Sequence, residues 1–458
     1  MAKLGSEANP LRVAVVGSGP SGFYAAEALL KSEHKAIVDM YERLPAPFGL
    51  VRSGVAPDHP KLKQSILVYD KIAQQPGFTF LGNVTIGKDL TPEELRAHYH
   101  AVIFTCGAET DRKLGVPGED LPGSHTATEF VGWYNGHPDY RDRVFDLSCE
   151  SAVIIGQGNV AADVGRILAK TVDELKTTDI AQHALDCLAQ SKIREIHVIG
   201  RRGPAQAKFT SKELREFGEL ADCQPIVDPA DLKLNPESQA ELADKTNMGS
   251  ASNFKIFESF AAQPASSKKR RCVFHFLEGP VALEGSARLE RVVLAKNRLE
   301  GQPFHQSARP TGETAKLDCG ILFRSIGYRG VAMPGVPFDD KAGVFRNVGG
   351  RITEDGNKPV PGLYVAGWIK RGPSGIIGTN RACAVGTVAA LFEDLAKLDS
   401  GSRRGAEGVR GLLAERGVRV IGYSDWQKID AAEINRGQPK GKPREKFTRV
   451  AEMISILG

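Results

Sequence analysis

The chain alternates short, largely apolar runs with segments in which apolar residues recur at helical spacing. Residues 13–16, 36–41 and 101–105 are such runs, bounded by glycines and polar residues. Runs of this length are typical of strands buried on both faces of a parallel sheet. The alanine-rich segment from about 21 to 31 lies between the first two runs and predicts a helix. This alternation favours an α/β fold built on parallel sheets.

The first apolar run ends in a glycine-rich turn. Residues 17–22 read Gly-Ser-Gly-Pro-Ser-Gly, a G-x-G-x-x-G sequence. In such a turn the first glycine makes the bend, the second lets a pyrophosphate approach the backbone, and the third lets the helix pack on the strand. The second run is followed by Glu42, whose carboxylate can accept hydrogen bonds from an adenosine ribose. These features predict a dinucleotide site of the FAD or NAD type.

A second dinucleotide motif begins at 151–155, where an apolar run leads into a G-x-G-x-x-A turn at 156–161. The next strand, predicted at 195–199, is followed not by an acid but by Arg201 and Arg202. Paired guanidinium groups suit a 2′-phosphate, which they bind through charge-assisted hydrogen bonds. The sequence therefore predicts an NADP site. The alternative is a surface turn that carries two arginines, and the preceding glycine turn weakens it.

A third apolar run, 363–366, again ends in glycine before a helix predicted over about 381–395. Two dinucleotides need two such domains, so we expect the third strand to complete the first domain. The predicted architecture is an α/β fold with two Rossmann-like dinucleotide-binding domains in a glutathione reductase-like arrangement, the FAD domain being discontinuous. We expect the FAD-binding domain to consist of residues 1–108 and 331–400, the NADP-binding domain to occupy 109–330, and a C-terminal extension to occupy 401–458.

Three local expectations concern the segments between these motifs. Asp58 stands two residues before Pro60, and we expect it to cap a helix that begins there. Residues 233–253 are polar, and we expect them to be flexible. The short apolar segment 273–276 is expected to be an antiparallel strand, together with the apolar segments that follow it.

Charge is distributed unevenly along the chain. The net charge is +5, while residues 401–458 hold twelve Lys or Arg against seven Asp or Glu, and Lys268–Arg271 is a run of four basic residues. Such runs are usually solvated, and the functional alternative is an acidic protein partner. Nucleic acid is not expected, because no aromatic-basic interleaving accompanies the charge. We expect Trp426 and Phe447 to anchor the tail by packing.

Cysteine usage and apolar runs bear on the compartment. The seven cysteines form no C-x-x-C pair, and their odd number argues against a disulfide framework. We therefore expect a reducing, cytoplasmic location and no protein-held metal or iron–sulfur site. No apolar run reaches the roughly 18 residues of a membrane span.

Taken together, the motifs resemble the adrenodoxin reductase-like ferredoxin–NADP reductases, and the bacterial, mycobacterial ferredoxin reductase-type members are the most similar. The resemblance covers residues 10–395. The segments that carry it read RVAVVGSGPSGFYAAEALL, FGLVRSGVAPDHPKLK, GQGNVAADVGRIL, VIGRRGPAQAKFT, IGYRG and LYVAGWIKRGPSGIIGTN. Trp368 stands where many other flavin enzymes have Asp, and this group shares the Trp.

The resemblance implies two cofactors, FAD in the first site and NADP(H) in the second, and a small iron–sulfur protein as electron partner. The residues that it implies for FAD are Ser21, Glu42, Leu50, Val84, Trp368, Gly375, Ile376 and Ile377. Those that it implies for NADP(H) are Gln157, Gly158, Asn159, Val160, Arg201, Arg202, Glu213 and Gly375.

The expected activity is that of an FAD-dependent ferredoxin–NADP⁺ reductase. NADPH delivers a hydride to the flavin, which passes single electrons to a ferredoxin of the [2Fe-2S] or another small type. His59 and Glu216 are the candidate catalytic pair, acting as a proton relay. The alternative is that His59 only orders its loop and that Glu216 is a solvated charge. Arg215, near Lys212, is our candidate docking residue for an acidic ferredoxin.

Two other classes share some features of this pattern. A pyridine nucleotide–disulfide reductase would have the same two sites, but it needs a redox-active cysteine pair of the C-x-x-C type, which the sequence lacks. A non-catalytic flavin-binding module would have no use for an NADP site, so Arg201 and Arg202 argue against it.

Overall fold

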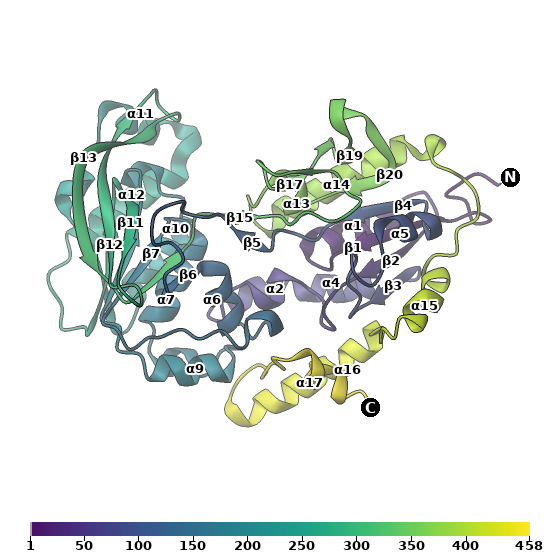
Figure 1. The fold of residues 1–458 in the computed structure, drawn as a ribbon, viewed down its shortest axis with the longest axis horizontal. Helices are drawn as coiled ribbons and strands as arrows, with labels where there is room; N and C mark the ends of the chain where they lie inside the picture. Colours follow the sequence, from purple (N-terminus) through teal and green to yellow (C-terminus); the bar gives the residue numbers. More distant parts are fainter. Residues whose placement is uncertain (1) are drawn as a thin grey trace.

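The computed structural model describes residues 2–458, which form two lobes (Figure 1). The first lobe is built on a seven-stranded sheet of order β18-β19-β20-β4-β1-β2-β3. Strands β20, β4, β1, β2 and β3 are parallel to one another, while β18 pairs antiparallel with β19 and β19 pairs antiparallel with β20. The bounds are β1 Leu11–Val16, β2 Ala36–Tyr41, β3 Phe78–Leu81, β4 Ala101–Phe104, β18 Asn347–Val348, β19 Arg351–Thr353 and β20 Pro359–Val365.

The second lobe contains a six-stranded parallel sheet of order β6-β14-β7-β8-β10-β9, with a three-stranded antiparallel sheet, β11-β12-β13, beside it. The parallel strands are β6 Ser124–Thr126, β7 Ser151–Ile155, β8 Glu195–Ile199, β9 Cys223–Val227, β10 Arg270–His275 and β14 Ile321–Arg324. The antiparallel strands are β11 Glu278–Glu284, β12 Arg291–Glu300 and β13 Ser307–Asp318.

The chain passes between the lobes twice. It leaves the first lobe after β4 and returns after β14, and the two crossings pair as a short antiparallel ribbon of β5 (Thr110–Asp111) and β15 (Tyr328–Arg329). The returning chain forms a second ribbon, β16 (Phe338–Asp339) with β17 (Val344–Phe345), before it rejoins the first sheet. The predicted fold class is therefore confirmed, including the discontinuous first domain. The exact domain boundaries remain a prediction.

Helices cover both sheets. The first lobe has α1 Pro20–Leu30, α2 Leu50–Ser53, α3 Pro60–Lys63, α4 Ile66–Ala73, α5 Pro92–His98, α13 Trp368–Arg371 and α14 Ile377–Glu393. The second has α6 Ala127–Tyr134, α7 Asn159–Ala169, α8 Val172–Leu175, α9 Gln182–Ala189, α10 Ser211–Arg215, α11 Pro236–Ala243 and α12 Met248–Ala261. Among residues 2–458, no helix is long and apolar enough to cross a membrane.

Strand β1 shows why its sequence is continuously apolar. Val13 and Val15 belong to the hydrophobic cluster on one face of the first sheet, and Ala14 and Val16 belong to the cluster on the other face. Both faces are therefore covered, as an uninterrupted apolar strand requires.

Three local expectations are wrong. Residues 233–253 are not loop but contain α11 and the start of α12, because polar side chains such as Asn235, which caps α11, are satisfied within the fold. The segment at 273–276 lies largely in β10, which is parallel to both of its neighbours, because it continues the second Rossmann-like sheet. Asp58 caps no helix, because its carboxylate is paired with Arg166.

The C-terminal tail carries α15 (Ala406–Glu415), α16 (Tyr423–Gly437) and α17 (Val450–Ser455). In Figure 1 this tail, in yellow, starts beside α5 of the first lobe and runs along the lower edge of the molecule toward the second. Trp426 and Phe447 are buried in the core of the first lobe, as predicted.

Candidate functional site

The first glycine turn has the geometry of a phosphate cradle. Gly17 has φ +108°, and a Cβ there would lie 2.7 Å from the carbonyl oxygen of Thr105. A Cβ on Gly22 would lie 2.1 Å from the carbonyl oxygen of Gly17, so only glycine permits the close contact of α1 with the turn. In front of Gly19, by contrast, no described atom lies within 4 Å of the Cβ position. That open position fits a dinucleotide pyrophosphate at the start of α1.

Glu42 lies against this turn. Its Oε2 accepts hydrogen bonds from the backbone N–H of Ser18 at 3.2 Å and from the Ser18 hydroxyl at 2.6 Å. The backbone N–H of Val84 donates to the Glu42 carbonyl at 2.9 Å, which brings this buried residue to the same edge of the sheet. Glu42 and Val84 are thus placed together beside the cradle, although they lie 42 positions apart in the chain.

The glycine segment that follows the third apolar run also lies beside the first glycine turn. Gly367 has φ +79°, and a Cβ there would lie 2.2 Å from the Ser21 hydroxyl on α1. Trp368 follows and stacks on Tyr328 at 5.4 Å between ring centroids. Its buried indole N–H has no hydrogen-bond acceptor within residues 2–458, so it is free to donate to a bound group.

The remaining candidate FAD residues lie at two helix starts. Leu50 opens α2 and is 39% exposed. Gly375, with φ +82°, and the exposed Ile376 lead directly into α14, which begins at Ile377. The helix predicted over about 381–395 is therefore present, although it begins four residues earlier than predicted.

The second glycine turn repeats the cradle. Gly156 has φ +129°, and a Cβ there would lie 2.1 Å from the Ser325 carbonyl oxygen. The Cβ position of Gly158 is open, with no described atom within 4 Å. Gln157 Nε2 donates to the His275 carbonyl at 2.8 Å, and Asn159 Oδ1 accepts from the Thr210 N–H at 2.8 Å. Both side chains therefore hold neighbouring loops, and half-buried Val160 follows on α7.

Arg201 and Arg202 follow β8 at the same edge. Arg201 is exposed, Arg202 is half-buried, and neither forms a salt bridge within 4.0 Å in the part of the chain that the structure describes. Burial, and then the neighbouring charge of Arg201, lower the pKa of Arg202. Glu241 acts on Arg202 only at longer range, without a salt bridge. Two close cations that form no salt bridge favour an anion such as a 2′-phosphate.

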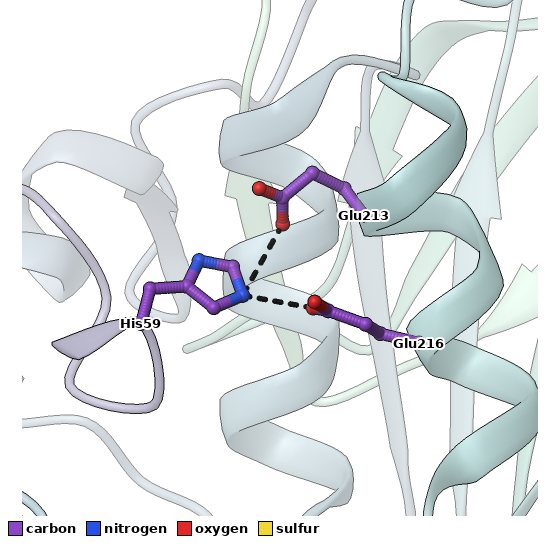
Figure 2. A group of neighbouring side chains, drawn as sticks. All are labelled: His59, Glu213 and Glu216. Carbon is purple, nitrogen blue, oxygen red and sulfur yellow. Dashed lines mark hydrogen bonds and ion pairs between the residues drawn. The ribbon is translucent and has the colours of Figure 1, made fainter. Parts of the chain in front are cut away.

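His59 and Glu216 meet where the two lobes face one another. His59 Nε2 lies 2.8 Å from Glu216 Oε2 and 3.5 Å from Glu213 Oε2 (Figure 2). His59 precedes α3 of the first lobe, whereas the two glutamates belong to α10 of the second lobe and the turn after it. The structure therefore brings the predicted catalytic pair together across the interface.

Arg166 on α7 organises this contact, although it was not among the predicted site residues. The fully buried guanidinium lies 3.1 Å from Asp58, 2.6 Å from Asp163 and 2.8 Å from Glu213. Burial would raise the pKa of Asp58, but Arg166, and then Lys170, outweigh it and lower the pKa to about 2. An arginine among the apolar residues of GQGNVAADVGRIL was the signal that could have identified this position.

The spacing of His59, Glu213 and Glu216 would also suit a metal ion. However, Arg166 lies 2.8 Å from Glu213 and 3.4 Å from Glu216, so a cation already neutralises these carboxylates. We assign no metal to them. Glu213 makes its contacts with Arg166 and His59, and its contact with NADP(H) remains a prediction.

Comparisons with known proteins agree with this geometry. Residues 15–77 match the family model described as an NAD(P)-binding Rossmann-like domain. The chain is 45% identical to "NADPH-ferredoxin reductase FprA" of Mycobacterium leprae, over 97% of this chain and 98% of that protein. It is also 45% identical to the human "NADPH:adrenodoxin oxidoreductase, mitochondrial", over 98% of this chain and 92% of that protein.

A solved structure gives the same result. "Mycobacterium tuberculosis FprA in complex with NADPH" superposes with a TM-score of 0.93 at 45% identity, covering 98% of this chain and 100% of that one. High identity over nearly the full length, with the same fold, shows the family. This chain belongs to the family of the NADPH-ferredoxin reductases and NADPH:adrenodoxin oxidoreductases.

Proposed function

We propose that this protein is an FAD-dependent ferredoxin–NADP⁺ reductase that passes electrons between NADPH and a small acidic ferredoxin. The observation that carries the proposal is the pair of open glycine cradles at Gly19 and Gly158, of which only the second is followed by two adjacent arginines that form no salt bridge within residues 2–458. One lobe is therefore suited to FAD and the other to NADP(H).

The FAD site would span both chain segments of the first lobe, 1–108 and 331–400. Glu42 binds the adenosine ribose, the α1 terminus binds the pyrophosphate, and Trp368 and the turn at 375–377 lie toward the flavin end. When bound, FAD accepts a hydride from NADPH and releases electrons singly. At the start of α14 the Ile376 N–H donates to Thr379 Oγ1 at 3.2 Å and the Thr379 N–H donates to the Ile376 carbonyl at 3.0 Å. The N–H groups of Ile377 and Gly378 would serve the flavin as hydrogen-bond donors.

The NADP(H) site would lie within residues 109–330. The backbone at 157–160 binds the pyrophosphate, while Arg201 and Arg202 bind the 2′-phosphate and select NADPH over NADH. Gln157 and Asn159 hold the loops around this backbone through their hydrogen bonds to His275 and Thr210.

His59 and Glu216 are proposed to hold a proton at the interface between the two sites. The short contact at 2.8 Å gives a direct path between His59 Nε2 and Glu216 Oε2. Arg166 fixes both ends of this pair, because it contacts His59 Nδ1 at 3.4 Å and Glu216 Oε2 at 3.4 Å. The alternative remains a contact that only orders the loop.

The partner is proposed to dock near α10, where Lys212 and Arg215 are exposed beside Glu216. Exposed cations steer an acidic protein to the surface without holding it permanently. We further propose a reducing, cytoplasmic location, which suits seven cysteines that are all free.

Two assays on the purified protein test the proposal. Acid precipitation should release FAD to the supernatant, because no residue of the predicted FAD set is a Cys or His that could link it covalently. Reduction of cytochrome c should require both NADPH and an added ferredoxin. Absence of FAD, or equal rates without ferredoxin, would refute the proposal.

A further inference from the structure

The C-terminal tail has no role in the cofactor sites described above, yet it is firmly anchored on the first lobe. The Tyr423 hydroxyl donates to Asp70 at 2.7 Å, and Trp426 packs edge-on against Phe48 at 5.8 Å. Glu433, which is fully buried, accepts hydrogen bonds from Arg52 through both oxygens, at 2.5 and 2.9 Å. Helix α16 is therefore bound to the first lobe by a buried, bidentate ion pair.

A few residues after α16, the chain contacts the second lobe as well. Lys442 Nζ donates to the Ile180 carbonyl at 2.8 Å, and the Gln182 N–H donates to Glu445 Oε1 at 3.2 Å. Further along, Thr448 accepts from Arg141 at 3.1 Å, and Arg449 pairs with Asp142. A segment of eight residues, 442–449, which we call the clasp, thus reaches α9 and the loops around it.

Lys446 joins the two lobes at the centre of the clasp. Its buried ammonium donates to the Arg52 carbonyl of the first lobe at 3.2 Å, and to the Asn135 carbonyl at 3.1 Å and the Asp179 carboxylate at 2.9 Å, both of the second. An ammonium has three N–H bonds, and these three acceptors use all of them. Lys63 of the first lobe binds the same Asp179 carboxylate at 2.7 Å.

We propose that the clasp fixes the orientation of the two lobes, with Lys446 as its positioning residue. Domains joined by linkers move relative to one another unless their interface holds them. A buried ammonium is tolerated only while its partners surround it, so the contact at Lys446 allows little variation in the spacing of Arg52, Asn135 and Asp179.

The consequence for the reaction rests on the proposed function. Hydride transfer needs the nicotinamide and the flavin in direct contact, and the two are held by different lobes. Displacement of reacting groups by about 1 Å can cost 10²-fold in rate. The clasp therefore sets the rate of flavin reduction without touching either cofactor.

The test uses the FAD-loaded protein with Lys446→Met and, as a control on the same tail, Lys428→Met, whose side chain is 63% exposed. Lys446→Met should retain FAD and bind NADPH within about 3-fold of the unmodified protein. Its single-turnover flavin reduction should fall about 10-fold or more, and small-angle scattering should show a larger, more variable separation of the lobes. The control should change neither.

A second variant, Thr448→Val with Arg449→Ala, removes only surface contacts of the clasp and should show the same changes more weakly. This variant keeps the test decisive if Lys446→Met does not fold. Unchanged scattering together with unchanged flavin reduction would overturn the proposal, as would loss of FAD from a folded variant, which would make the tail a component of the FAD site. Because scattering does not depend on catalysis, it decides the role of the clasp even if NADPH proves not to be the reductant.

Discussion

His59 and Glu216 lie 157 positions apart and in different lobes, yet His59 Nε2 is 2.8 Å from Glu216 Oε2. No carboxylate on the same loop makes this contact, so the pair exists only when the lobes are assembled. The fully buried Arg166 holds this pair in position through its own contacts. These contacts are with Asp58, His59, Glu213 and Glu216.

If this pair relays a proton, Glu216→Gln should slow NADPH-driven flavin reduction by about 10- to 100-fold, within the range for acid–base groups. The amide keeps a hydrogen bond to His59 but cannot exchange the proton, so the pH dependence of the rate should also flatten. Stopped-flow reduction between pH 6 and 9 measures both. Glu219→Gln, an exposed neighbour, is the control. A slower rate with an unchanged pH profile would favour the loop-ordering role.

Nucleotide choice should depend on Arg201. Arg201→Ala should lower kcat/KM for NADPH. The activation free energy should rise by about 1.5–3 kcal/mol, the range for hydrogen bonds to charged groups. NADH turnover should change little, because NADH has no 2′-phosphate. Arg298→Ala, a 67% exposed arginine on β12, is the matched control. Equal losses with the two nucleotides would refute a role in 2′-phosphate binding.

Because the pKa of Asp58 is lowered to about 2, we expect this carboxylate to make the stability of the protein depend on pH. Since the folded pKa is below the unfolded value of about 3.9, the stabilisation is present above pH 4 and is lost as the pH falls toward 2. Asp58→Asn should lower the free energy of unfolding by about 2 kcal/mol at pH 7.

Urea unfolding at several pH values measures this contribution. The difference between Asp58→Asn and the unmodified protein should stay constant from pH 8 to 5 and shrink below pH 4. Asp173→Asn, an 82% exposed carboxylate paired with Lys176, should have little effect at any pH. A difference that grew on acidification would contradict the assigned charge state.

Docking of the ferredoxin should be sensitive to charge on α10. Arg215→Glu should raise the KM for ferredoxin at low salt and leave NADPH-dependent ferricyanide reduction near normal, because surface charges act mainly on encounter rate. Added salt should have the same effect on the unmodified protein. Loss of both activities would show that Arg215 acts in the nicotinamide site or stabilises the fold. Loss of neither would indicate that the ferredoxin docks elsewhere, at residues 268–271 or the basic tail.

The sequence predicted the features that rest on local rules. A Cβ would collide with the backbone at Gly17, Gly22 and Gly156, and space is left open at Gly19 and Gly158. These requirements select glycine, so they are visible in the sequence as the glycine motifs. The continuous apolar character of β1 likewise follows from burial on both faces.

What could not be predicted depends on contacts between distant segments. Arg166 and Asp58 lie 108 positions apart, and Lys446 and Arg52 lie 394 apart, so no periodicity links them. The expectation of flexibility at residues 233–253 is wrong for the same reason. The buried carboxylate of Glu241 accepts hydrogen bonds from Gln206 at 2.9 Å and Gln306 at 2.8 Å, which satisfies polar groups that look solvent-exposed in sequence.

Electron transfer from NADPH through FAD to ferredoxin is measured by mixing the purified, FAD-loaded protein anaerobically with NADPH. The flavin absorbance is followed, and oxidised ferredoxin is then added. We predict rapid bleaching by NADPH, far slower bleaching by NADH, and return of the oxidised flavin spectrum as the ferredoxin is reduced. Bleaching at equal rates by the two nucleotides, or a reduced flavin that ferredoxin does not reoxidise, would contradict the assignment as a ferredoxin–NADP⁺ reductase.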